Sequence, residues 1–307
     1  MLWDAALFVL GIVILVLGAE VLVRGGSKIA AALGMSPLMI GLTIVSIGTS
    51  APELVVTVTA SATGHPEVAI GNVVGSNILN TLIVLGATAA LYPVAVHRDT
   101  VKMDLPMVAA ASAMVWLMAA DGVVSVMDGI ILLAGMVLYL QHLYEREGRS
   151  SEARQRDHKA GAAAMVAVVA GIAMLVVGGD LVVDAGSRIA NDLGVPERII
   201  ALTLVAFGTS APELATSLVA AFRKHVDLAV GNVVGSNLLN LFFVLGGASV
   251  INAIPVPDST INLDLLVMTL SAFVLLQFAS SRFRIRRGEG VAMVLAYFVY
   301  LAYLLST

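Results

Sequence analysis

The sequence predicts an all-α integral membrane protein of ten transmembrane helices, arranged as two inverted five-helix repeats with both termini outside. Three observations lead to this fold class: the composition, a repeat at a fixed offset, and the distribution of basic residues. Of the 307 residues, 59% are hydrophobic and only 12% are charged, whereas a soluble domain carries about 25% charged residues. Almost the whole length is therefore expected to lie in the bilayer.

Ten apolar runs are long enough to cross the hydrocarbon core, which takes about 20 helical residues. They cover residues 5–23, 36–62, 68–94, 104–120, 124–143, 163–183, 196–222, 228–254, 263–280 and 290–305. The second, third, seventh and eighth runs are unusually long, and Gly, Pro, Ser or Asn interrupt each of them. One clearly polar segment divides the chain, so we expect a repeat at 1–143, a short cytoplasmic linker at 144–159 and a second repeat at 160–307.

Two sequence blocks occur twice, 160 residues apart (208 − 48 and 231 − 71). Residues 48–54 and 208–214 read Gly-Thr-Ser-Ala-Pro-Glu-Leu, and residues 71–77 and 231–237 read Gly-Asn-Val-Val-Gly-Ser-Asn. Other residues align at the same offset: Glu20 with Asp180, and Asp104 with Asp264. A second copy that begins after five crossings enters the membrane from the opposite face. The two repeats must then have inverted topology.

The basic residues agree with this count of spans. With the N-terminus outside, the outer loops hold only Arg188 and Arg198 of the 17 lysines and arginines. All the others fall on the inner side, as expected for cytoplasmic loops. We therefore expect a multi-pass protein of the cell (inner) membrane, with membrane lipid as its surroundings.

The first block predicts a polar, broken helix inside an apolar span. On a helix, Thr49 and Ser50 share a face with Glu53, because residues three and four apart are neighbours. Pro52 has no N–H to donate to the carbonyl of Gly48, so the helix should break here. Such a break is tolerated at membrane depth only inside the protein or along a cavity. The second copy repeats the pattern with Thr209, Ser210, Pro212 and Glu213.

A carboxylate at membrane depth costs about 2.5 kcal/mol or more, so Glu53 and Glu213 are functional candidates. The pseudo-twofold symmetry should bring them together near the midplane. The second block adds serine and asparagine at a spacing of four: Ser76 with Asn80, and Ser236 with Asn240. All of these donors are hard oxygen atoms, and the chain has no cysteine. This chemistry favours Na⁺ or Ca²⁺ over Zn²⁺ or Cu⁺.

The repeated blocks resemble the two alpha-repeats of the sodium/calcium exchanger family, within the calcium/cation antiporter superfamily, and the chain is similar to its short prokaryotic members. The resemblance covers the whole chain. It implies a secondary antiporter that exchanges Na⁺ for Ca²⁺ by alternating access. The implied ligands are Glu53, Glu213, Thr49, Ser50, Thr209, Ser210, Ser76, Ser236, Asn80 and Asn240, with the backbone carbonyls of Ser46 and Ala206.

Asparagine at both 80 and 240 narrows this expectation. Potassium-dependent relatives carry Asp at the position of Asn240, so the resemblance favours exchange that does not need K⁺. A cation/H⁺ antiporter, such as a Ca²⁺/H⁺ antiporter, is the alternative, and a cation channel is a weaker one. We expect no enzymatic activity and no cofactor, with small cations as substrates, no nucleic acid and no obligate protein partner.

Three further interpretations concern structural residues. Glycines 71, 75, 231 and 235 should let helices approach closely. Asn72, Asn77, Asn232 and Asn237 can bond the backbone freed at the breaks, and we take them as structural. Asp104 and Asp264 should open helices, where their charge complements the helix dipole.

Overall fold

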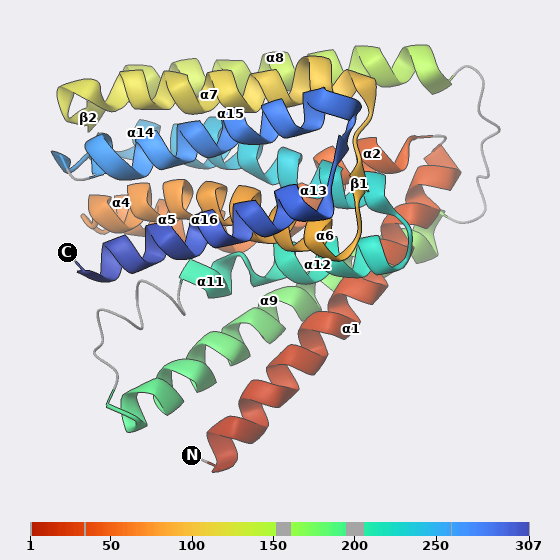
Figure 1. Cartoon of the computed structure of the whole chain (residues 1–307), viewed down its shortest axis with the longest axis horizontal. Helices are drawn as coiled ribbons and strands as arrows, with labels where there is room; N and C mark the ends of the chain where they lie inside the picture. Colours follow the sequence, from red (N-terminus) through yellow and green to blue (C-terminus); the bar gives the residue numbers. More distant parts are fainter. Residues whose placement is uncertain (1, 34, 152–160, 195–205, 259, 307) are drawn as a thin grey trace.

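A computed structural model describes residues 2–33, 35–151, 161–194, 206–258 and 260–306. Helices make up nearly all of this part of the chain (Figure 1). The α-helices are α1 (Leu2–Leu33), α2 (Pro37–Ile40), α3 (Ser46–Thr49), α4 (Ala51–Ala62), α5 (Pro66–Leu79), α6 (Gly86–Leu91), α7 (Leu105–Met118), α8 (Val126–Ser151), α9 (Gly161–Asp192), α11 (Ala206–Thr209), α12 (Ala211–Phe222), α13 (Val226–Leu238), α14 (Gly246–Ile251), α15 (Leu265–Arg282) and α16 (Arg287–Ser306). Wider π-helical turns join several of them: η1 (Gly41–Val45), η2 (Asn80–Leu85), η3 (Thr100–Asp104), η6 (Leu239–Leu245) and η7 (Thr260–Asp264).

The described helices account for most of the predicted spans. Within the described residues, eight helices are long and apolar enough to cross a membrane, and a bent pair is a ninth candidate. The pair consists of Pro37–Thr49 and Ala51–Ala62, bent by 47°. The predicted span 196–222 retains only α11 and α12, because residues 195–205, with Arg198, lie outside the described residues. The number ten therefore stays a prediction.

Two helices extend beyond the ends that their apolar runs predict. The run that begins α1 ends at residue 23, yet the helix continues to Leu33. The run in α8 ends at residue 143, yet this helix continues to Ser151, and the rest of the predicted linker lies outside the described residues. A charged residue ends an apolar run without ending a helix. Arg24, for example, bonds to Glu20 one turn earlier on the same helix.

The helices α1 and α9 pack together as a close antiparallel pair, set diagonally against the rest of the molecule (Figure 1). Small residues face each other along it: Gly11 with Gly178, Gly18 with Gly171, and Gly25 with Ala164. A Cβ atom on Gly11, Gly18 or Gly25 would lie 3.0 or 3.1 Å from the backbone oxygen opposite. This seven-residue spacing of glycine suits a helix pair in a membrane, where packing rather than hydrophobicity drives association.

The helices α5 and α13 form the centre of the remaining bundle, with Val73 and Val233 fully buried. The helix α13 packs against α2 and η1. A Cβ atom on Gly231 would lie 2.5 Å from the backbone oxygen of Leu38 in α2. The predicted close approach at Gly231 is thus confirmed. For Gly71, the corresponding neighbours would be the residues 160 positions after Leu38, Gly41 and Leu42. These fall within 195–205, outside the described residues.

Two short antiparallel strand pairs tie distant loops together. β1 (Val94–Ala95) pairs with β4 (Arg284–Ile285), and β2 (Val123–Val124) pairs with β3 (Ile254–Pro255). Strands of two residues are too short to show a period of two, so hydropathy could not predict them. Each pair connects a loop that follows the first copy of the repeated blocks to a loop that follows the second.

A buried ion pair links α7 to α8. The carboxylate of Asp104 is fully buried and accepts hydrogen bonds from Nη1 of Arg146 at 3.0 and 3.1 Å and from the hydroxyl of Tyr139 at 3.4 Å. Asp104 does precede α7, but its side chain makes no capping bond there. Asp104 thus stands at the start of α7 as predicted, while its carboxylate is paired with Arg146 of α8. At the equivalent position, Asp264 accepts a hydrogen bond from Tyr300 at 2.8 Å.

Replacing Arg146 by Gln should destabilise the protein by about 3 kcal/mol, because an unpaired carboxylate would remain buried. Thermal unfolding of the purified protein in detergent measures this loss. The double variant Arg146→Gln/Asp104→Asn should recover much of it, since both charges are then removed. Losses that simply add in the double variant would contradict the pairing.

Candidate functional site

The first repeated block lies at a break between two helices. Thr49 ends α3, Ala51 begins α4, and Ser50 between them has φ −83° and ψ 9°. Pro52 stands in the first turn of α4, where its missing N–H removes no helical hydrogen bond. The predicted interruption is confirmed here. In the second copy, Ser210 separates α11 from α12 with φ −91° and ψ 3°.

The two glutamates are fully buried, and each one is bonded to a serine from the other copy of the block. Oε1 of Glu213 accepts the hydroxyl of Ser50 at 3.0 Å, and Oε1 of Glu53 accepts the hydroxyl of Ser210 at 3.3 Å. A second hydroxyl reaches each carboxylate from the helix that follows it: Ser76 to Glu53 at 3.4 Å, and Ser236 to Glu213 at 3.2 Å. The carboxylates and these four serines therefore form two hydrogen-bonded groups, each with residues from both copies of the blocks, and we call the two groups together the polar cluster.

Several buried polar atoms around this cluster have no hydrogen-bond partner among the described residues. The oxygen atoms are Oε2 of Glu53, Oε2 of Glu213, and Oδ1 of Asn80 and of Asn240, whose side chains are fully buried. The amide nitrogens of Asn80 and Asn240 also lack a partner. The helix of Glu213 packs against η2, which contains Asn80, and the helix of Glu53 packs against η6, which contains Asn240. A buried polar atom without a partner costs about 1–3 kcal/mol. Hard oxygen atoms left in this way suit a cation such as Na⁺ or Ca²⁺.

The described residues contain no group of three or more His, Cys, Asp or Glu side chains placed to hold a metal ion. A cation at the cluster would therefore need hydroxyl and amide oxygens in addition to the two carboxylates.

Two asparagines hold the backbone of the glutamate turns. Nδ2 of Asn72 donates to the carbonyl of Glu53 at 3.2 Å, and Nδ2 of Asn232 donates to the carbonyl of Glu213 at 3.4 Å. Their oxygen atoms accept the threonine hydroxyls of the opposite copy: Thr49 to Asn232 at 3.0 Å, and Thr209 to Asn72 at 3.4 Å. A hydroxyl oxygen has two lone pairs, so the oxygen atoms of both threonines can still bind a cation.

Asn77 and Asn237 do not act in the same way. Nδ2 of Asn77 donates to the carbonyl of Val73 in its own helix at 2.7 Å, and Nδ2 of Asn237 donates to the hydroxyl of Thr81 at 3.0 Å. The expectation that these two bond the broken backbone is corrected. Both point away from the glutamate turns because each lies five residues beyond Asn72 or Asn232, on a different helix face.

The structure describes the surroundings of the two predicted backbone ligands, Ser46 and Ala206, to different extents. The carbonyl of Ser46 accepts the N–H of Ser50 at 2.9 Å and the hydroxyl of Thr49 at 3.4 Å. Ala206 begins α11, directly after the residues that lie outside the description.

Two polar residues that lie beside the cluster were not predicted from the sequence. Thr57 accepts a hydrogen bond from Asn72 at 2.9 Å, and Ser217 accepts one from Asn232 at 3.1 Å. Both are fully buried. A signal was present, because each lies four residues after a glutamate and the two are related by the same 160-residue offset (217 − 57).

The aligned acids Glu20 and Asp180 have different surroundings. Glu20 bonds to Arg24 on its own helix and to Nε of Arg223 at 2.9 Å, beyond the end of α12. Asp180 and Asp184, in contrast, line a cavity of about 330 Å³ between α9 and the starts of α4 and α12. Thr209 of the second block also lines this cavity. The cavity therefore connects acidic residues of α9 to the polar cluster.

Comparison with known proteins agrees with this chemistry. The family model of the sodium/calcium exchanger protein matches residues 3–144 and 163–306. The inner membrane protein YrbG of Escherichia coli is 35% identical, with 99% of this chain and 97% of YrbG covered. The sodium/calcium exchanger MaX1 of Methanosarcina acetivorans is 30% identical, with 97% of each chain covered.

A solved structure has the same fold. The sodium-calcium exchanger NCX_Mj, soaked with 2.5 mM Na⁺ and 0.1 mM Ca²⁺, superposes with a TM-score of 0.88 at 30% identity. The match covers 98% of both chains. The protein is thus a multi-pass membrane transporter rather than an enzyme, and its cargo is small cations including Ca²⁺. From the matched family model, the relatives and the shared fold, the chain belongs to the sodium/calcium exchanger family.

Proposed function

We propose that this protein is a secondary antiporter that exchanges Na⁺ for Ca²⁺ by alternating access, at one site built on Glu53 and Glu213. The reciprocal bonds between Ser50 and Glu213 and between Ser210 and Glu53 carry this proposal. They support a single site to which both copies of the block contribute. The implied ligands Thr49, Thr209, Ser76, Ser236, Asn80 and Asn240 complete it, with the carbonyls of Ser46 and Ala206.

Charge balance explains how exchange follows from this site. Two carboxylates neutralise one Ca²⁺ or two Na⁺, so each kind of ion competes with the other for the same oxygens. Because Ca²⁺ takes 6–8 oxygen ligands, hydroxyl and amide oxygens must supply those that two carboxylates cannot. Asn80 and Asn240 add no charge to the pair, which favours exchange that is independent of K⁺.

The same proposal includes the topology. Ten spans would form two inverted repeats, 1–143 and 160–307, joined by a cytoplasmic linker at 144–159, with both termini outside. The basic residues of the sequence support this orientation. The relative YrbG is named an inner membrane protein, and we place this chain in the inner membrane as well. The cavity beside Asp180 would then open toward the outside.

Ion flux in proteoliposomes tests the function. Vesicles containing the purified protein are given a Na⁺, K⁺ or H⁺ gradient, one at a time, and uptake of radioactive Ca²⁺ is measured. We expect uptake only against an opposing Na⁺ gradient, with no change when K⁺ is added. Protein-free vesicles, and vesicles in which an ionophore has dissipated the Na⁺ gradient, serve as controls.

Two results would replace the proposal. Equal Ca²⁺ uptake with a pH gradient and no Na⁺ gradient would favour a Ca²⁺/H⁺ antiporter. Single-channel currents far above carrier turnover would favour a cation channel.

A further inference from the structure

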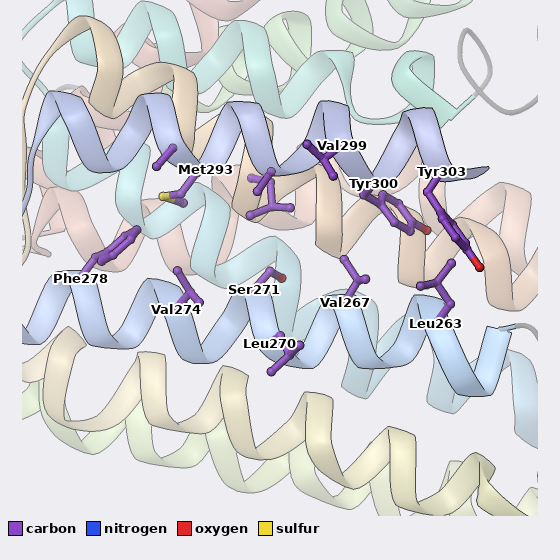
Figure 2. Close-up of a pocket in the computed structure, with 13 residues that line it drawn as sticks. Leu263, Val267, Leu270, Ser271, Val274, Phe278, Met293, Val299, Tyr300 and Tyr303 are labelled. Atoms are coloured by element: carbon purple, nitrogen blue, oxygen red, sulfur yellow. The ribbon is translucent and has the colours of Figure 1, made fainter. Parts of the chain in front are cut away.

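A long apolar groove runs between α15 and α16. It has a volume of about 500 Å³, within the range of small-molecule sites. Figure 2 shows Phe278 and Met293 facing each other at one end, and Leu263 and Tyr303 at the other. Leu82 of η2 also lines the groove. Its walls are almost entirely aliphatic and aromatic.

The groove faces the surroundings of the protein rather than its core. Only 11% of the most apolar stretch of α16 is buried, and 33% of that of α15. In a chain that spans a membrane, this face meets lipid. The acyl chain of a lipid is therefore the expected occupant of this apolar groove.

The length of the groove suits one acyl chain. From Leu263 to Phe278 the helix advances about 22 Å at about 1.5 Å per residue. One leaflet of the hydrocarbon core is about 15 Å deep, half of about 30 Å. The groove is therefore longer than one leaflet is deep, and an acyl chain that enters at the Phe278 end can lie in the groove over the full depth of its leaflet.

Arginines gather at this same end. Phe278 lies one turn before Arg282, and α16 begins at Arg287, less than two turns before Met293. Between these helices lie Arg284 and Arg286. All four arginines are exposed, and none forms an ion pair among the described residues.

Residues 282–289 hold four arginines and one carboxylate, that of Glu289, so this segment keeps a net positive charge. One carboxylate oxygen of Glu289 accepts the backbone N–H of Arg286 at 2.7 Å, at the start of α16. A further arginine, Arg98, lies over the ring of Phe283, 5.2 Å from its centroid. Clusters of arginine beside a membrane helix attract anionic lipid headgroups.

We propose that the groove between α15 and α16 binds an anionic phospholipid, with one acyl chain along the groove and its phosphate at Arg282 and Arg287. The apolar groove holds the acyl chain, and the arginines provide the selectivity for an anionic headgroup. Each arginine near the headgroup contributes about a fivefold preference, so the two together contribute about 25-fold.

Native mass spectrometry of the purified protein tests the site. Phosphatidylglycerol and phosphatidylcholine with identical acyl chains are compared as probes. The wild-type protein should retain phosphatidylglycerol in preference, and Arg282→Gln/Arg287→Gln should reduce that preference about 25-fold. Unchanged preference in this double variant would overturn the headgroup assignment. Because the arginines are exposed, the variant should elute as a single folded species.

A matched pair of tryptophans tests the groove itself. Ala296 lines the groove and is exposed, whereas Ala302 is exposed on the same helix but outside the groove. Ala296→Trp should prevent retention of phosphatidylglycerol, and Ala302→Trp should not. Equal behaviour of the two variants would overturn the groove, since the arginines would then attract lipid only loosely. The readout is lipid retention, so it is independent of which ions the protein exchanges.

Discussion

Replacing Glu213 by Gln should abolish Na⁺-driven Ca²⁺ uptake while the protein still folds. Glutamine has nearly the same shape, and its oxygen can still accept the hydroxyls of Ser50 and Ser236. What the variant loses is one of the two negative charges that balance the ion. Losing a charged partner in a buried site costs about 2–5 kcal/mol, so Ca²⁺ should bind roughly 30-fold to several thousand-fold more weakly.

Glu53→Gln should behave in the same way, because Glu53 has the equivalent bonds to Ser210 and Ser76. Radioactive Ca²⁺ uptake into proteoliposomes at increasing Ca²⁺ concentrations measures both losses. The matched control is Glu67→Gln, at an exposed carboxylate in the first turn of α5. Full uptake by either buried variant, at wild-type affinity, would remove that glutamate from the site.

A side chain at Gly231 should prevent the correct packing of α13. A Cβ atom there would lie 2.5 Å from the oxygen of Leu38 and 2.9 Å from the nitrogen of Leu42. Both neighbours are backbone atoms and cannot rotate away. Overpacking of this kind costs about 1–3 kcal/mol and occasionally more. We expect Gly231→Val to lie at the upper end of this range, with a lower melting temperature or loss of the folded protein.

Gly247→Val provides the comparison. Nothing among the described residues lies within 4 Å of a Cβ atom on Gly247, and the residue 160 positions earlier is Ala87, which already carries a Cβ atom. The melting temperature of this variant should remain close to that of the wild type. Equal destabilisation of both valine variants would mean that general strain from valine, rather than the crossing at Gly231, lowers stability.

The sequence predicted the positions of most helices because an apolar run must match the thickness of the bilayer. It also predicted the break at Ser50, because Pro52 cannot continue a helix. The pairing of residues 160 apart followed from the repeat. Within the described residues, Glu53, Glu213 and the serines of both copies do lie in one cluster. Their role as ion ligands stays a proposal.

The sequence did not predict contacts between distant helices, because no local sequence pattern identifies the partner residue. The pair of Arg146 with Asp104 joins residues 42 positions apart, and neither has a nearby signal that identifies the other. The sequence did not predict the π-helical turns η2 and η6 either, because one wider turn leaves the hydrophobic period of the helix almost unchanged. Glycines at 11, 18 and 25 carried a visible spacing, but only the structure shows that α9 lies against them.

The reciprocal serine bonds also have a consequence for biosynthesis. Glu53 is made 157 residues before Ser210, which donates one of its two hydroxyl bonds. At about 5–20 residues per second, the chain needs roughly 8–30 s to reach that serine. During this time the first glutamate lies in an unfinished bundle without its partner from the second copy. The early helices must therefore remain inserted with an incompletely bonded carboxylate, and the site is completed only when the later helices arrive.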